Sequence, residues 1–194
     1  MTVSIPDWTT EGVLPPVDAG SPTSPSRSPY AVSLIDLVQR FGTSKERIEI
    51  LDGFLNYRQG LHDAGLTQGF QWLDGSYLEH VEALESRSPN DIYVVSFIEF
   101  PEAISQLQIK DRYDEIIGLT RSTKLAIKRK YQVDAYLVSL ALSPADLFAQ
   151  TSYWYSMWSH RRNSTWKGFV QLPLSPDSRA RHALEKMKYP GVTA

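Results

Sequence analysis

Three short features of the sequence have the residue types that phosphate and magnesium chemistry require. The first is Gly75-Ser76, which follows an apolar segment and offers backbone N–H groups and a hydroxyl to phosphate oxygens. The others are Asp91, which begins a β-branched and aromatic segment, and Asp134, which lies early in another apolar segment. Carboxylates are among the hard oxygen ligands that Mg²⁺ prefers. The pattern therefore predicts a site for a nucleoside triphosphate with magnesium.

Each feature also has a purely structural explanation. Gly75-Ser76 can be an ordinary turn between a strand and a helix. Asp91 can be a residue at a loop–strand boundary that its neighbours cap. Asp134 can be a buried acid that pairs with an arginine or lysine of the basic segment 121–130, because an unpaired buried carboxylate is costly. The occurrence of all three features, in this order, favours the nucleotide site.

A group of cations near the C-terminal end is the second candidate feature. Arg161, Arg162 and Lys167 lie in an aromatic-rich segment, and stacking surfaces combined with cations suit a nucleobase or single-stranded RNA. Trp154 and Trp158 are at helical spacing, which favours packing in the core. The basic segment 121–130 fits either a solvated helix face or a ridge for a nucleotide or RNA backbone.

Composition excludes several other classes of function. The net charge of −2 gives no general affinity for nucleic acid or an acidic membrane, so any basic site must be local. The absence of cysteine excludes disulfides, thiolate zinc sites and cysteine nucleophiles. No apolar run approaches the ~18 residues of a membrane span, and the N-terminus lacks a signal-peptide pattern, so we expect a cytoplasmic protein. The histidines have no zinc-helix spacing; they are His62, His80, His160 and His182.

The elements that must position these residues follow a proline-rich N-terminal arm, residues 1–30. This arm holds six of the twelve prolines, and its apolar residues predict docking on the domain surface. Residues 31–194 are expected to form one domain. Apolar periodicity predicts helices over 31–42, 44–65, 113–130, 144–158 and 175–188, and strands over 69–74, 91–100, 132–140 and 167–174. This order predicts an α/β (α+β) fold with a small mixed β-sheet, flanked by helices and covered mainly on one side.

Five segments resemble the nucleotidyltransferase superfamily related to DNA polymerase beta, and within it a bacterial group of minimal nucleotidyltransferase-like proteins. They are "GVLPPV", "RIEILDGFLNYRQGLHDAG", "DGSYLEHVE…RSPNDIYVV", "YQVDAYLV" and "SHRRNSTWKGFVQL", which together span about residues 11–174. The resemblance implies that Gly75 and Ser76 hold the triphosphate and that Asp91 and Asp134 are catalytic metal ligands of a two-Mg²⁺ site. Arg161, Arg162 and Lys167 would then neutralise charge on the nucleotide.

Position 93 departs from this pattern, because the family has a second acid where this chain has Tyr93. A phenol is neutral near pH 7 and is a poor magnesium ligand. Two functions are therefore open. One is transfer of a nucleotidyl group from an NTP to an RNA, protein or small-molecule acceptor. The other is a catalytically impaired fold that binds a nucleotide or a partner. The resemblance also implies a toxin–antitoxin or phage-defence setting, with a protein partner encoded nearby and no membrane contact.

Overall fold

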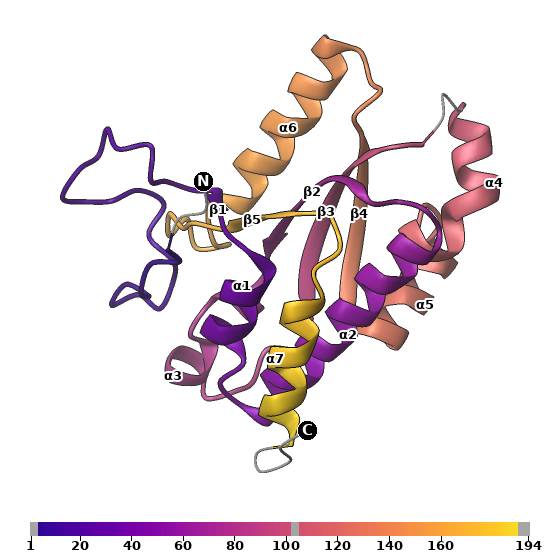
Figure 1. Cartoon of the computed structure of the whole chain (residues 1–194). Coiled ribbons are helices and arrows are strands. Elements are labelled where there is room, and N and C mark those ends of the chain that lie inside the picture. Colours follow the sequence, from indigo (N-terminus) through magenta and orange to yellow (C-terminus); the bar gives the residue numbers. More distant parts are fainter. Residues whose placement is uncertain (1–3, 102–104, 190–194) are drawn as a thin grey trace.

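A five-stranded mixed sheet runs through the computed structural model, which describes residues 4–101 and 105–189 (Figure 1). The spatial order of the strands is β1-β5-β2-β3-β4. β2 is antiparallel to both β3 and β5, whereas the β3–β4 and β1–β5 pairs are parallel. The predicted α/β fold with a mixed sheet is thus confirmed. The strands are β1 (Tyr30–Ala31), β2 (Gln68–Asp74), β3 (Ile92–Glu99), β4 (Val133–Ser139) and β5 (Val170–Pro173).

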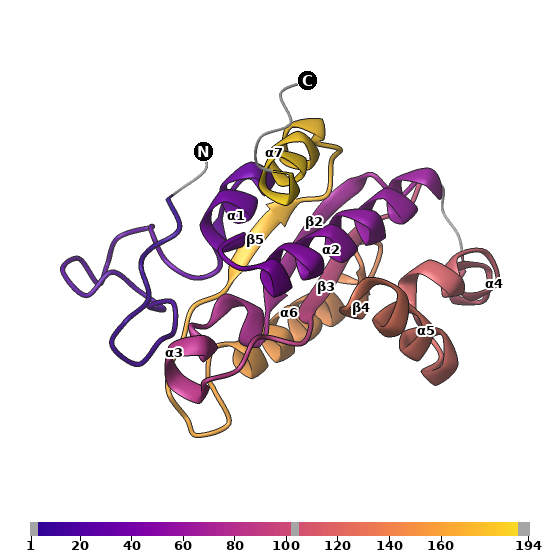
Figure 2. The ribbon, with the colours of Figure 1, turned by 90° about the horizontal axis from the view of Figure 1, so that it is seen from below.

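Three helices cover one face of the sheet, namely α1 (Leu34–Phe41), α2 (Lys45–Asp63) and α7 (Ser178–Lys188) (Figure 2). Each begins at a side chain that accepts a hydrogen bond from a backbone N–H of the first turn. These caps are Ser33 for α1, Ser44 for α2 and Asp177 for α7.

One long helix, α6 (Pro144–Trp158), lies on the opposite face (Figure 2). Trp154 and Trp158 are buried, and Trp158 packs edge-to-face on Phe169 with ring centroids 6.0 Å apart. This confirms the predicted core role of the two tryptophans. The sheet has α1, α2 and α7 on one face and α6 on the other, which agrees with the expectation that helices cover it mainly on one side (Figure 2).

The predicted single helix over 113–130 is wrong, because the chain forms two helices there, α4 (Gln106–Ile117) and α5 (Arg121–Tyr131). Gly118 ends α4 in the left-handed conformation, with φ 69°, and Thr120 then caps α5. The apolar pattern continues through the break, which is why the sequence suggested one helix. Leu119, which that helix would have turned inward, is 44% exposed.

The N-terminal arm contacts the domain through a few apolar residues. Val13 and Leu14 are buried, and the Trp8 indole Nε1 donates a hydrogen bond to the Leu78 carbonyl at 2.7 Å. The same indole stacks on His80, with ring centroids 4.4 Å apart. Residues 1–3, 102–104 and 190–194, which belong to the predicted arm and domain, lie outside the described residues. Within the described ranges no helix combines the length and apolar character needed to cross a bilayer.

Candidate functional site

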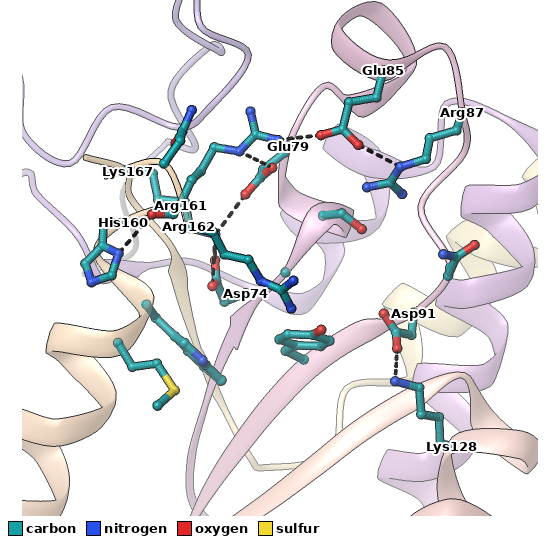
Figure 3. A pocket seen from close by; sticks show the side chains of 17 residues that line it. Asp74, Glu79, Glu85, Arg87, Asp91, Lys128, His160, Arg161, Arg162 and Lys167 are labelled. Carbon is teal, nitrogen blue, oxygen red and sulfur yellow. Dashed lines mark hydrogen bonds and ion pairs between the residues drawn. The ribbon is translucent and has the colours of Figure 1, made fainter. Parts of the chain in front are cut away.

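A cavity of about 1040 Å³ opens at one end of the sheet (Figure 3). β2 ends at this edge, and β3 and β4 begin there, because β2 is antiparallel to β3 and β3 is parallel to β4. The wall of the cavity also includes the turn that follows β2, the segment before β3 and the C-terminal end of α6 with the loop after it. The turn comprises a 3₁₀ segment, η1 (Ser76–Leu78), and a short helix, α3 (Val81–Glu85).

Most of the residues predicted for the site line this one cavity, although they are far apart in the sequence. They are Gly75, Ser76, Asp91, Tyr93, Arg161, Arg162 and Lys167. Asp134 is not in the wall, but it contacts a lysine that is. The segments that carry the predicted residues therefore meet at one cavity, and the contacts among them decide what the site can do.

Tyr93 lies between two acids across three neighbouring strands. It is paired with Asp74 of β2 on one side and with Asp134 of β4 on the other. Directly paired residues project from the same face of a sheet, so the row reads acid, phenol, acid. A ring thus occupies the position where the resemblance predicts a second metal-binding carboxylate.

Gly75 makes room for that ring. Its φ of 94° is in the region that favours glycine, and a Cβ added to it would lie 3.2 Å from Cγ of Tyr93. The backbone conformation therefore favours glycine, and a side chain here would also press on the phenol. Ser76 follows at the cavity wall, half-buried.

Lys128 of α5 lies between the two predicted metal ligands. Its Nζ is 2.5 Å from Oδ2 of Asp91 and 3.4 Å from Oδ2 of Asp134, and it lies 5.9 Å from the ring centroid of Tyr93. Burial alone would lower the pKa of Lys128, but the two carboxylates outweigh it and raise that pKa. For Asp134, the structural explanation is therefore correct, since this acid pairs with a lysine of the basic segment.

These residues do not fit a two-magnesium site. An ammonium already balances the charge of Asp91 and Asp134, and Tyr93 adds only a neutral phenol. The remaining acid of the row, Asp74, is paired with another lysine. Among the described residues no group of three or more histidine, aspartate or glutamate side chains is arranged to hold a metal ion.

That other lysine, Lys167, is buried between two carboxylates, with only 4% of its surface exposed (Figure 3). Its Nζ donates to both oxygens of Asp74, at 2.7 and 2.9 Å, and to Oε1 of Glu79 at 2.9 Å. Burial opposes the charged form, but the two carboxylates raise the pKa of Lys167 above its ordinary value. Burial raises the pKa of Asp74, and Lys167 opposes that rise. With two carboxylates so close, the Lys167 side chain is a protonated ammonium.

The chain of ion pairs continues along the cavity wall to its rim. Arg161 lies 3.1 Å from Glu79 and 2.5 Å from Glu85, and Arg87 lies 2.7 Å from the other oxygen of Glu85. Hydrogen bonds from Arg87 and Arg161 lower the pKa of Glu85. Arg162, the next residue along, is exposed and lines the cavity, and it forms no ion pair with any residue in the described ranges.

Sequence reasoning missed the partners of the predicted residues. They are Asp74, Glu79, Glu85, Arg87 and Lys128. A signal for Asp74 was present, because it is an acid at the end of the apolar segment "FQWL" and directly precedes the glycine of the turn. Lys128 had no such signal, since it is one of several cations on its helix.

Comparisons with known proteins identify one family, whose function is unknown. No curated protein matches the chain, and no solved structure matches it. A family model described as a family of unknown function matches residues 6–173, which is most of the chain and includes every residue of the cavity wall. The chain therefore belongs to that family, DUF6932.

Proposed function

We propose that this protein is a nucleotide-binding subunit, built on a nucleotidyltransferase-like fold whose metal site is replaced by an internal ion pair. The observation that carries the proposal is the ammonium of Lys128, 2.5 Å from Asp91 and 3.4 Å from Asp134. Tyr93 supports it, because it stands beside these acids in place of the carboxylate that the resemblance predicts.

The cavity has the composition of a nucleotide site. Ligand sites commonly enclose ~300–1,000 Å³, and this cavity of about 1040 Å³ has room for a base, a ribose and phosphate. Trp158 and Tyr93 provide aromatic surface, and the amides of Asn90 and Asn163 can donate to and accept from the edge of a base. Such a mixture of aromatic, amide and cationic groups suits a base linked to an anion.

A lysine in this position supports binding but not transfer. An ammonium that balances Asp91 and Asp134 lowers their repulsion of an anion in the cavity. It cannot act as the Lewis acid that lowers the pKa of an attacking hydroxyl and bridges two phosphate oxygens. Binding without nucleotidyl transfer is therefore the function that these contacts support best.

One observation favours the second candidate, metal-dependent transfer of a nucleotidyl group to an RNA, protein or small-molecule acceptor. The side chain of Lys128 is 42% exposed, so its ammonium can leave the two carboxylates without crossing the core. Asp91 and Asp134 would then be free to bind a cation. The two candidates make different predictions for one assay.

The test incubates the chain with each labelled NTP, Mg²⁺ and total RNA or lysate, and it measures bound and transferred label separately. We expect retained label but no transfer, and we expect Lys128→Ala to weaken retention. Arg129→Ala, an exposed change on the same helix, is the matched control and should leave retention unchanged. Transfer by the unaltered chain that disappears in Asp91→Ala would establish the second candidate instead.

The variant Tyr93→Asp shows what the phenol contributes. Together with Lys128→Ala it restores a row of carboxylates and removes the competing ammonium. Transfer by this double variant alone would show that the site lacks only its metal ligands, which agrees with the proposal. Transfer already present before either change would contradict it.

A further inference from the structure

Nearly all the charge in the cavity wall is already paired. The wall contains five basic residues, Arg87, Lys128, Arg161, Arg162 and Lys167, and four acidic residues, Asp74, Glu79, Glu85 and Asp91. Lys167 is held by Asp74 and Glu79, Arg161 by Glu79 and Glu85, Arg87 by Glu85, and Lys128 by Asp91. Within the described part of the chain, Arg162 is the only one of the five without a carboxylate partner.

The loop that carries Arg162 is fixed on both sides. The backbone N–H of Lys167 donates to the carbonyl of Ser159 at 2.8 Å, and the N–H of Arg161 donates to the carbonyl of Thr165 at 2.9 Å. The carbonyl of Arg161 in turn accepts from the N–H of Ser164. Because Arg161 is also tied to Glu79 and Glu85, the loop holds the next side chain over the cavity (Figure 3).

A free guanidinium in this place suits one phosphate group. Its planar set of N–H donors forms paired hydrogen bonds with phosphate oxygens. Among the described residues of the wall, no other arginine or lysine is without a carboxylate partner for a second or third phosphate, which would lie among the four carboxylates. Without a metal to offset that repulsion, each added phosphate costs binding energy.

We infer that the ligand is a nucleotide with a single phosphate, and that Arg162 binds that phosphate. This inference rests on the proposed function and makes it more specific. The phosphate can belong to a free nucleoside monophosphate or to the phosphodiester of a short oligonucleotide, since both present the same group to Arg162.

Calorimetric titration in EDTA tests the inference with adenosine, AMP, ADP and ATP, and with the corresponding series for the other bases. We expect a monophosphate to bind, and we expect no gain in affinity from the second or third phosphate. Arg162→Ala should weaken binding of the monophosphate by about tenfold or more and leave binding of the nucleoside unchanged. Arg162→Lys should recover part of the loss.

Arg129→Ala, which removes an exposed arginine that does not line the cavity, is the matched control and should change neither affinity. A dinucleoside monophosphate identifies the source of the phosphate. Tighter binding than AMP indicates an oligonucleotide, and weaker binding indicates a free monophosphate.

Two results would overturn the inference alone. One is ATP binding about tenfold more tightly than AMP, and the other is Arg162→Ala leaving AMP affinity unchanged while the variant unfolds at the same temperature as the parent. Failure of every nucleotide and nucleoside to bind is a different result, because it overturns the proposed function as well.

Discussion

At the scale of single residues, the site depends on how Gly75 and Tyr93 fit together. A side chain at position 75 would meet the Tyr93 ring at 3.2 Å and would also require a left-handed backbone. The two effects can be separated, because Gly65 has a similar φ of 82° but open space around its missing side chain. The pair therefore measures what the contact with the phenol adds.

We expect Gly75→Ala to lower the free energy of unfolding by about 1–3 kcal/mol and to weaken nucleotide binding. Gly65→Ala, at a similarly positive φ and with no non-neighbouring atom within 4 Å of the added Cβ, should cost about 1 kcal/mol and leave binding intact. Urea unfolding and calorimetric titration of both variants give the comparison. Equal costs and equal binding would show that the phenol does not rest on Gly75 in solution.

The buried ammonium of Lys167 supports a second prediction at this scale. Lys167→Met leaves Asp74 buried without a cation and leaves Glu79 with Arg161 alone, which should cost about 3–5 kcal/mol of unfolding free energy. Lys188→Met is the matched control, because Lys188 also pairs with two acids, at 3.3 and 3.5 Å, but at the surface. It should cost less than about 1 kcal/mol. Similar losses in the two variants would contradict the buried network.

At the scale of elements, the junction between α4 and α5 is the part that the sequence did not predict. Gly118 costs a helix only about 1 kcal/mol, so the residue alone does not decide between one helix and two. Asp114 stabilises the break between the two helices. Its carboxylate accepts hydrogen bonds from the N–H of Leu119 at 2.6 Å, from the N–H of Thr120 at 3.1 Å and from the hydroxyl of Thr123 at 2.9 Å. These contacts close the turn and orient α5, and with it Lys128.

We expect Asp114→Ala to destabilise the protein by about 1–2 kcal/mol at neutral pH. Although burial opposes ionisation, the hydrogen bonds from Thr123, Leu119 and Thr120 lower the pKa of Asp114. A lowered pKa stabilises the folded state above the ordinary aspartate pKa, and that contribution is lost as the pH falls through the lowered value. The difference between variant and parent should therefore shrink in acid.

Urea unfolding across acidic and neutral pH measures this difference. Asp111→Ala removes an exposed acid one turn earlier on the same helix and serves as the control, with little effect expected at any pH. A difference for Asp114→Ala that persists unchanged in acid would show that the ionised carboxylate is not what closes the turn.

At the scale of the whole molecule, the sequence predicted four of the five strands, most helices and the segments that meet at the cavity, whereas β1 was placed in the N-terminal arm and the first helix. It could do so because Gly75-Ser76, Asp91 and Asp134 stand at strand ends, and strand ends on one edge of a sheet meet. It could not predict the pairing of charges. Lys167 and Asp74 are 93 positions apart, and Lys128 is one cation among several on α5.

The same limit explains the change in the expected function. An acid early in β4 fits both a metal ligand and a lysine partner when only the sequence is known. Packing of α5 against β4 brings Lys128 to Asp134, and this contact favours binding over transfer. Fold prediction and site chemistry thus rest on different information, the first on local patterns and the second on long-range contacts.

The central claim is that the cavity binds a nucleotide without a metal ion. The most direct measurement is a calorimetric titration of AMP, ADP and ATP into the same protein sample, once with EDTA and once with excess Mg²⁺. Because Lys128 takes the place of the metal, we expect binding in EDTA and no increase in the affinity for AMP when Mg²⁺ is added. Nucleotide binding that appears only with Mg²⁺ would contradict the account.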